Sequence, residues 1–200
     1  GVSPIQEKQM VTQKGKNTFV VGIHGNFDDA QTGVKKIFSD KELAKEMDAK
    51  GFQFSSANSI NIGRLVPQIC YYVYAYAQLC KDGKITAGEK INVVVPTGNF
   101  GNILAAFYAK NMGLPIDKLI CASNDNKVLY DFFRTGTYDR NREFVLTTSP
   151  SMDILISSNL ERLIYRIAGN DADKNRELMN ALSGNGKYEI TDEMKAQLAD

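Results

Sequence analysis

Short apolar runs alternate along the chain with segments whose apolar residues recur every three or four positions. Apolar runs rich in β-branched residues predict buried strands at residues 18–23, 91–95, 119–122 and 144–147. The helical spacing gathers apolar side chains on one face of a helix. It predicts helices at residues 4–14, 28–38, 40–49, 58–82, 103–112, 126–134, 160–168, 171–182 and 191–199. Apolar strands that alternate with helices predict an α/β fold with three αβα layers and a mostly parallel sheet.

Particular residues mark where helices begin or bend. Ser3 and Gln6 have the spacing of a capping box, and Asp28 is expected to cap the helix that follows it. Pro67 interrupts the long apolar helix and is expected to kink it, because proline has no backbone N–H.

Composition narrows the classes of partner and compartment. Of the 200 residues, 24 are Lys or Arg and 23 are Asp or Glu, so the net charge of +1 argues against a nucleic-acid partner. The longest apolar stretch, residues 65–80, is interrupted by polar residues and predicts no membrane span. Three cysteines without a CxxC pair, together with one histidine, make a zinc site or a disulfide framework improbable and suit the reducing cytoplasm.

The strongest candidate for chemistry is the 96–102 loop, Pro-Thr-Gly-Asn-Phe-Gly-Asn, which follows a predicted strand and opens a predicted helix. Its two glycines let the backbone turn sharply, and the free N–H groups of the first helical turn attract an anion such as phosphate. The loop lacks the Gly-Lys-Ser/Thr ending of a nucleotide P-loop and the G-x-G-x-x-G pattern of a dinucleotide site. An ordinary turn without a ligand remains the alternative.

A second polar cluster, at residues 55–64, places five small polar side chains and one arginine at a predicted helix start. Such a cluster can hold a carboxylate or a phosphate by hydrogen bonds. The residue types alone favour a structural interpretation, in which Asn58 or Ser59 caps the helix and Arg64 makes an ion pair.

Two further segments are interpreted as structural. His24 with Asp28 or Asp29 is a poor set of metal ligands, so a hydrogen-bonded histidine is expected and no metal is assigned. Residues 149–153 are typical of a turn with a helix cap. A single histidine also supports no Ser/His/Asp or Cys/His catalytic arrangement.

The order of these segments resembles the threonine synthase family, in the tryptophan-synthase-β-like group of pyridoxal-phosphate enzymes. The motifs that carry the resemblance are residues 24–29, 58–61 with Arg64, 96–102 and 149–153. The resemblance implies fold type II and pyridoxal 5′-phosphate (PLP) as cofactor. In that family the Gly-Asn-Phe-Gly-Asn loop cradles the cofactor phosphate, which assigns cofactor binding to Gly98, Asn99, Phe100, Gly101 and Asn102. The candidates for the substrate side are Asn58, Ser59, Asn61 and Arg64.

The reaction that the resemblance implies converts O-phosphohomoserine and water to threonine and phosphate, by γ-elimination and β-addition with the cofactor as electron sink. The family's Schiff-base lysine lies in a Lys-Asp motif upstream of the matched region, and Lys81-Asp82 stands in the wrong order to replace it. No catalytic residue is therefore assigned. The chain is expected to be an internal fragment that is inactive alone and that self-associates through unpaired strand edges.

The resemblance also gives a domain division and leaves two other functions open. Residues 1–168 are interpreted as part of the PLP-binding large domain, and residues 169–200 as a helical C-terminal continuation that is not an independent domain. A non-catalytic α/β domain could bind a phosphorylated ligand at the same helix start. Another fold-type-II enzyme such as threonine dehydratase would share the cofactor, although such relatives usually carry a more glycine-rich phosphate loop.

Overall fold

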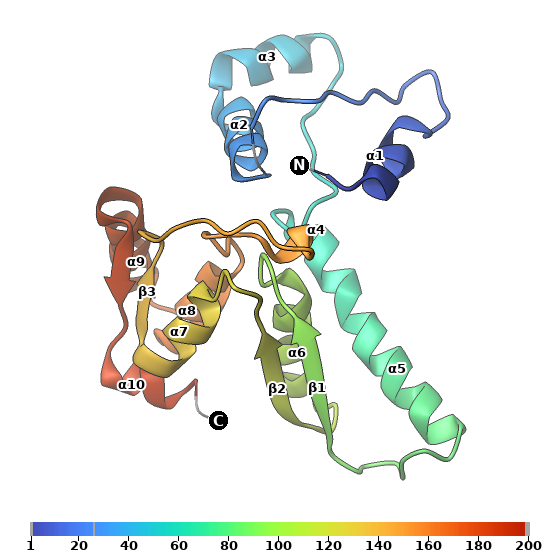
Figure 1. Cartoon of the computed structure of the whole chain (residues 1–200), viewed down its shortest axis with the longest axis vertical. Helices are drawn as coiled ribbons and strands as arrows, with labels where there is room; N and C mark the ends of the chain where they lie inside the picture. Colours follow the sequence, from blue (N-terminus) through green and yellow to red (C-terminus); the bar gives the residue numbers. More distant parts are fainter. Residues whose placement is uncertain (1, 26, 199–200) are drawn as a thin grey trace. The chain divides into compact units, whose positions relative to one another are not determined.

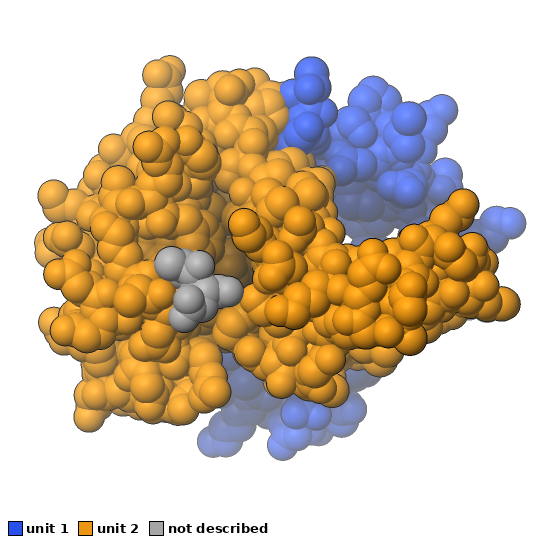
Figure 2. Space-filling model, turned by 90° about the horizontal axis from the view of Figure 1, so that it is seen from below, with its two compact units in different colours: residues 1–55, 148–150 blue, residues 56–147, 151–200 orange. Residues whose placement is uncertain are grey.

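A computed structural model describes residues 2–25 and 27–198, with the side chains of residues 27 and 28 outside the description. The chain forms two compact units, residues 1–55 with 148–150 and residues 56–147 with 151–200, which Figure 2 colours separately. Figure 1 labels the helices and strands. The division at residue 168 remains a proposal.

The described residues of the smaller unit contain three helices, α1 (Pro4–Val11), α2 (Phe27–Ser39) and α3 (Lys41–Ala49). The predicted capping box of α1 is confirmed, since Gln6 N donates to Ser3 Oγ at 3.3 Å and Ser3 N donates to Gln6 Oε1 at 2.9 Å. α1 ends before the predicted end at residue 14. The side chain of the other predicted cap, Asp28, lies outside the described residues.

The strand predicted at residues 18–23 is wrong. This segment is irregular, and its side chains are exposed, 84% for Phe19 and 83% for Val21. A strand needs a neighbouring strand to satisfy its backbone groups. No other segment of the smaller unit is a strand in the described residues, so residues 18–23 have no pairing partner there.

The larger unit is built on a strand–helix–strand repeat. β1 (Ile91–Pro96) and β2 (Ile116–Ala122) pair in parallel, and α6 (Gly101–Asn111) connects them. Both predicted strands are confirmed, and with them the α/β class and the parallel pairing. Since parallel strands end at the same edge of a sheet, the 96–102 loop leaves β1 beside the end of β2 (Figure 1).

The apolar helix before β1 is interrupted at Pro67, as predicted. A short α4 (Ile62–Leu65) passes into the 3₁₀ turn η1 (Val66–Gln68) before α5 (Ile69–Lys81) begins. α5 packs against α6, and Tyr72 Oη donates to the Asn102 carbonyl at 2.8 Å. This bond ties α5 to the end of the 96–102 loop.

The chain after β2 combines helices with a second pair of strands. Its elements are α7 (Val128–Thr135), β3 (Thr137–Asp139), η2 (Pro150–Met152), α8 (Leu160–Ile167), α9 (Ala172–Asn185), β4 (Lys187–Glu189) and α10 (Asp192–Ala196). β3 and β4 form an antiparallel pair that the apolar pattern does not predict, with the rings of Tyr138 and Tyr188 stacked at 5.4 Å. The predicted end of the last helix, residue 199, lies outside the described residues.

The strand predicted at residues 144–147 is wrong, because side chains satisfy its backbone instead of a neighbouring strand. Val145 N donates to Asn126 Oδ1 at 2.9 Å, and Asn126 Nδ2 donates to the Val145 carbonyl at 2.7 Å. Thr147 N donates to Asp153 Oδ2 at 2.9 Å. Such bonds give the backbone an alternative to a strand ladder.

The core of the larger unit holds α6, α7 and α8 together. Leu104, Phe132 and Ile164, one from each helix, are fully buried in one apolar cluster. Because α6 and α8 share this core, the start of α8 is held close to the start of α6. In the described part of the chain, no helix combines the length and the apolar character needed to cross a bilayer.

Candidate functional site

The 96–102 loop is fixed at both of its ends. Thr97 N donates to the Ala122 carbonyl of β2 at 3.0 Å, which extends the strand pairing into the loop. Asn102 Nδ2 donates back across the loop to the Pro96 carbonyl at 3.0 Å. The loop is therefore a defined structure at the carboxyl end of the two strands.

The peptide groups inside the loop point in a defined direction. The Gly98 carbonyl accepts a hydrogen bond from Ser157 Oγ at 2.8 Å, and the Asn99 carbonyl accepts from Asn159 N at 3.1 Å and Nδ2 at 2.9 Å. In a planar trans peptide, the N–H of the next residue points the opposite way. The N–H groups of Asn99 and Phe100 therefore face away from Ser157 and Asn159.

These N–H groups form a cluster of free donors. Among the described residues, the backbone N–H groups of residues 98–102 donate to no partner. The first N–H groups of α6 lack partners within the helix, and the helix dipole adds partial positive charge there. Phe100 has a φ of 65°, and a left-handed residue in such a turn helps to form an anion-binding concavity. The loop thus has the features of an anion site.

Close packing requires the two glycines of the loop. A Cβ on Gly98 would lie 2.6 Å from the Ser151 carbonyl oxygen, and a Cβ on Gly101 would lie 2.9 Å from Ser59 Cβ. Neither glycine has a left-handed backbone, since the residue that adopts this region is Phe100. The glycines therefore serve the close approach of two neighbouring segments.

Three buried polar atoms at this edge have no hydrogen-bond partner among the described residues. They are Asn99 Oδ1, Ser123 Oγ and Ser158 Oγ. Ser123 directly follows β2, and Ser158 lies shortly before α8. Neither residue was among those assigned to the site from the sequence. Buried polar atoms are nearly always paired with protein, water or ligand. These atoms indicate that a polar molecule completes the site.

One of the four substrate-side candidates contacts the loop. Ser59 lies against Gly101, and its Oγ accepts from Asn159 Nδ2 at 3.0 Å. The other three candidates make local bonds: Asn58 Oδ1 with Ile60 N, Asn61 Oδ1 with Gly63 N, and Arg64 Nε with the Ala57 carbonyl. The cap of α4 is therefore Asn61, where the structural interpretation expected Asn58 or Ser59, and Arg64 bonds to a carbonyl where an ion pair was expected.

Residues 149–153 contain the turn η2 followed by the buried carboxylate of Asp153. Asp153 accepts hydrogen bonds from Asn124 Nδ2 (2.7 Å), Asn126 Nδ2 (3.1 Å), Thr147 Oγ1 (2.7 Å) and Thr147 N (2.9 Å). Burial raises the pKa of Asp153, but these bonds outweigh burial and hold the pKa below its ordinary value. The carboxylate thereby anchors the segment whose Ser151 carbonyl lies against Gly98.

Replacement of Asp153 by asparagine is expected to flatten the dependence of stability on pH. Because its folded pKa is lowered, ionised Asp153 stabilises the fold above the ordinary value of 3.8, and this stabilisation is lost as the pH falls from 3.8 through the folded pKa. Urea unfolding from neutral to acid pH measures the effect. The control is Asp125→Asn, which replaces an exposed aspartate. The wild type and this control should lose stability more steeply with falling pH than Asp153→Asn. Equal slopes would contradict the role of Asp153.

His24, which with Asp28 or Asp29 was judged a poor set of metal ligands from the sequence, belongs to the smaller unit. His24 is exposed. Among the described side chains, no three His, Cys, Asp or Glu residues gather closely enough to hold a metal ion.

Comparisons with known proteins give a consistent family. No protein-family model matches the chain. Threonine synthase-like 1 of Homo sapiens is 48% identical over 192 residues, which cover 95% of this chain and 26% of that protein. Threonine synthase of Saccharomyces cerevisiae is 42% identical over 199 residues, covering 94% of this chain and 37% of that protein. The crystal structure of PLP-bound threonine synthase from Brucella melitensis has a TM-score of 0.81 and 41% identity, covering 99% of this chain and 40% of that chain.

The chain thus spans between about a quarter and two fifths of the length of these relatives. Sequence identity extends over nearly the whole chain, and the α/β fold is shared with the solved structure. The chain is therefore homologous to one part of the threonine synthases.

Proposed function

We propose that the chain is part of a threonine synthase, which converts O-phosphohomoserine and water to threonine and phosphate with the help of PLP. The observation that carries the proposal is the cluster of N–H groups at residues 98–102, which donate to no described residue and lie at the start of α6. Further support comes from the solved relative of Brucella melitensis, a threonine synthase with bound PLP.

The residues of the loop fit a phosphate group that is held and not transferred. The donors are backbone N–H groups, the helix dipole favours an anion, and no cationic side chain belongs to the loop. The residues that would hold the phosphate of PLP are Gly98, Asn99, Phe100, Gly101 and Asn102. Bound PLP would supply an electron sink for the elimination and the addition.

Ser59 is the substrate-side candidate with the firmest support, because Asn159 ties it to the loop. Asn58 and Asn61 would have to exchange their local hydrogen bonds for bonds to a substrate. Arg64 is exposed, and only Nε of its guanidinium has a partner in the described part of the chain. Its terminal nitrogens could therefore bind an anionic group of the substrate.

A titration of the chain with inorganic phosphate, followed by the NMR signals of the backbone amides, tests the proposed function. The amide signals of residues 98–102 should shift and saturate, because their N–H groups would donate to the phosphate. The amide of Gly113, beyond the other end of α6, serves as the control. Shifts spread evenly over the chain, or none at the loop, would contradict the proposal.

We infer that catalysis needs residues that this chain does not contribute. No lysine here matches the family's Lys-Asp motif in the required order. The purified chain with PLP and O-phosphohomoserine is expected to yield no threonine in an amino-acid assay. Measurable threonine formation would show this inference to be wrong.

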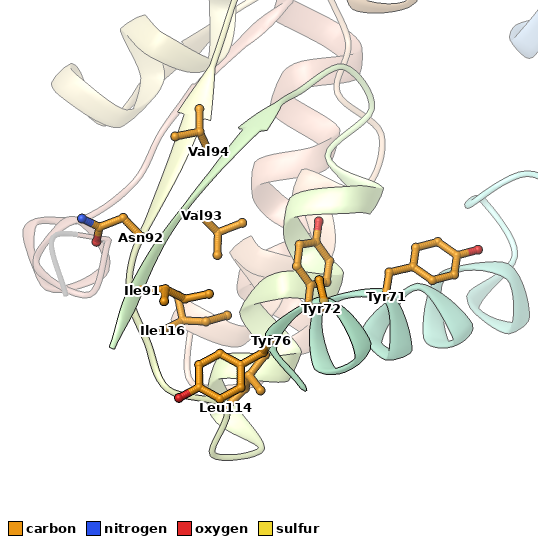
Figure 3. Close-up of a pocket in the computed structure, with 10 residues that line it drawn as sticks. Tyr71, Tyr72, Tyr76, Ile91, Asn92, Val93, Val94, Leu114 and Ile116 are labelled. Atoms are coloured by element: carbon orange, nitrogen blue, oxygen red, sulfur yellow. The ribbon is translucent and has the colours of Figure 1, made fainter. Parts of the chain in front are cut away.

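Self-association of the chain is expected from the open edges of its parallel sheet. In the described residues, β1 and β2 pair only with each other. A hollow of about 460 Å³ lies beside β1, and Tyr72 and Tyr76 project toward it from α5 (Figure 3). Unpaired strand edges and apolar surface favour pairing between copies. Sedimentation should show association that increases with concentration, and a constant monomer would contradict it.

A reducing compartment, such as the cytoplasm, suits the thiols of the protein. Cys70, Cys80 and Cys121 are all free. Free thiols persist where cellular reductants keep them reduced. We therefore propose that the protein resides in the cytoplasm.

A further inference from the structure

The start of α8 contacts two segments that lie far away in the sequence. Asn159 is 1% exposed and donates from Nδ2 to the Asn99 carbonyl at 2.9 Å and to Ser59 Oγ at 3.0 Å. Arg162, one turn later, donates to the carbonyls of Ser59 at 3.0 Å and Ile60 at 2.9 Å. Arg162 also donates to Asn159 Oδ1, so the two side chains form one connected group.

We propose that Asn159 and Arg162 are positioning residues for the phosphate site, an inference that rests on the proposed function. They act on the carbonyl side of the loop. The Asn99 carbonyl and the Phe100 N–H belong to one planar trans peptide group and point in opposite directions within it. Because Asn159 holds the carbonyl, it also holds the direction of the Phe100 N–H, toward the place where the anion would lie. Arg162 fixes Ser59, which lies against Gly101 at the end of the same loop.

The backbone of Phe100 explains why the loop needs this support. Its φ of 65° is costly for a residue other than glycine and persists only where the surroundings hold it. Asn159 provides two hydrogen bonds to the preceding carbonyl, from N and from Nδ2. Phe100 is 3% exposed, and its ring stacks on that of Phe133 with 6.1 Å between the ring centroids, so the side chain is held as well as the backbone.

The bonding of Arg162 points to a positioning role in place of anion binding. None of the ion pairs in the described part of the chain includes Arg162. Its guanidinium reaches two successive carbonyls at once, which its planar and rigid fork of donors allows. A lysine has a single ammonium group and lacks this fork, so Arg162→Lys is a sensitive variant.

The first test compares the affinities for PLP and for pyridoxal, which lacks the phosphate. Asn159→Ala and Arg162→Lys are measured beside the matched controls Asn175→Ala in α9 and Arg166→Lys in α8. The ratio of the two affinities should fall about tenfold in the first pair and stay unchanged in the controls. A merely structural role would lower the affinities for PLP and pyridoxal alike. An unchanged ratio of the two affinities would therefore overturn the inference.

The second test needs no ligand and separates this inference from the proposed function. In the ligand-free chain, the chemical shifts of the Asn99 and Phe100 backbone amides should differ from those of the wild type in Asn159→Ala. They should match the wild type in Asn175→Ala. Arg162→Lys serves in its place should Asn159→Ala fail to fold. Unmoved signals would overturn the positioning role. A wild-type chain that binds PLP and pyridoxal equally would instead contradict the phosphate site, while the amide signals still decide the positioning.

Discussion

Replacement of Gly98 by alanine is expected to weaken the binding of PLP to the chain by about 100-fold and to leave the binding of pyridoxal nearly unchanged. The new Cβ would lie 2.6 Å from the Ser151 carbonyl oxygen, closer than unbonded atoms approach. Neither the loop at Gly98 nor the segment at Ser151 can move apart easily. Ser157 holds the Gly98 carbonyl, and the hydrogen bonds of Asp153 anchor the segment that follows Ser151.

The size of the effect follows from the bonds that a displaced loop would lose. A hydrogen bond to a charged group contributes about 1.5–3 kcal/mol, which corresponds to about 10- to 150-fold in affinity. Gly184→Ala is the matched control, because Gly184 lies inside α9 and its added Cβ would meet no atom within 4 Å apart from its chain neighbours and the backbone of its own helix. This control should bind PLP normally and gain up to about 1 kcal/mol of stability. Normal PLP binding by Gly98→Ala would contradict the assigned role of the loop.

Replacement of Phe132 by alanine is expected to lower the free energy of unfolding by about 3–5 kcal/mol. Phe132 is 0% exposed, and its ring lies 5.5 Å from Phe133, 5.8 Å from Tyr138 and 5.9 Å from Tyr188. Alanine would leave a cavity where α7 meets the β3–β4 pair, and these aromatic contacts would be lost. A domain is stable by only about 5–15 kcal/mol, so this is a large share of the total.

Urea unfolding measures this effect, with Phe19→Ala as the control. Phe19 is 84% exposed, so its removal should change the free energy of unfolding by less than about 0.5 kcal/mol. Equal effects of the two substitutions would show that the cluster around Phe132 does not carry the stability of the larger unit.

The strand–helix–strand repeat could be predicted because its signals are local. The apolar run of β1, the two glycines and the helical spacing of α6 follow one another within residues 91–111. The strands predicted at residues 18–23 and 144–147 were wrong because a strand depends on a partner elsewhere in the chain. For residues 144–147, the partners are the side chains of Asn126 and Asp153, which an apolar pattern does not reveal.

The site could be predicted only in part for a similar reason. The glycines and the helix start indicated an anion site at residues 98–102, and the polar cluster contained Ser59. Asn159 and Arg162 gave a weaker signal, since polar residues at a helix start are typical of caps. Their contacts cross 60 and 103 positions of the sequence, so only the folded chain brings them to the loop. The three successive polar residues before α8, at 157–159, were the one available sign.

The measurement that tests the central claim most directly is a calorimetric titration of the wild-type chain with PLP and, separately, with pyridoxal. The claim is that residues 98–102 bind the phosphate of the cofactor. We expect PLP to bind at least about 100-fold more tightly than pyridoxal, since only PLP can accept hydrogen bonds from the loop through its phosphate. Equal affinities, or no binding of either compound, would contradict a phosphate site formed by this chain.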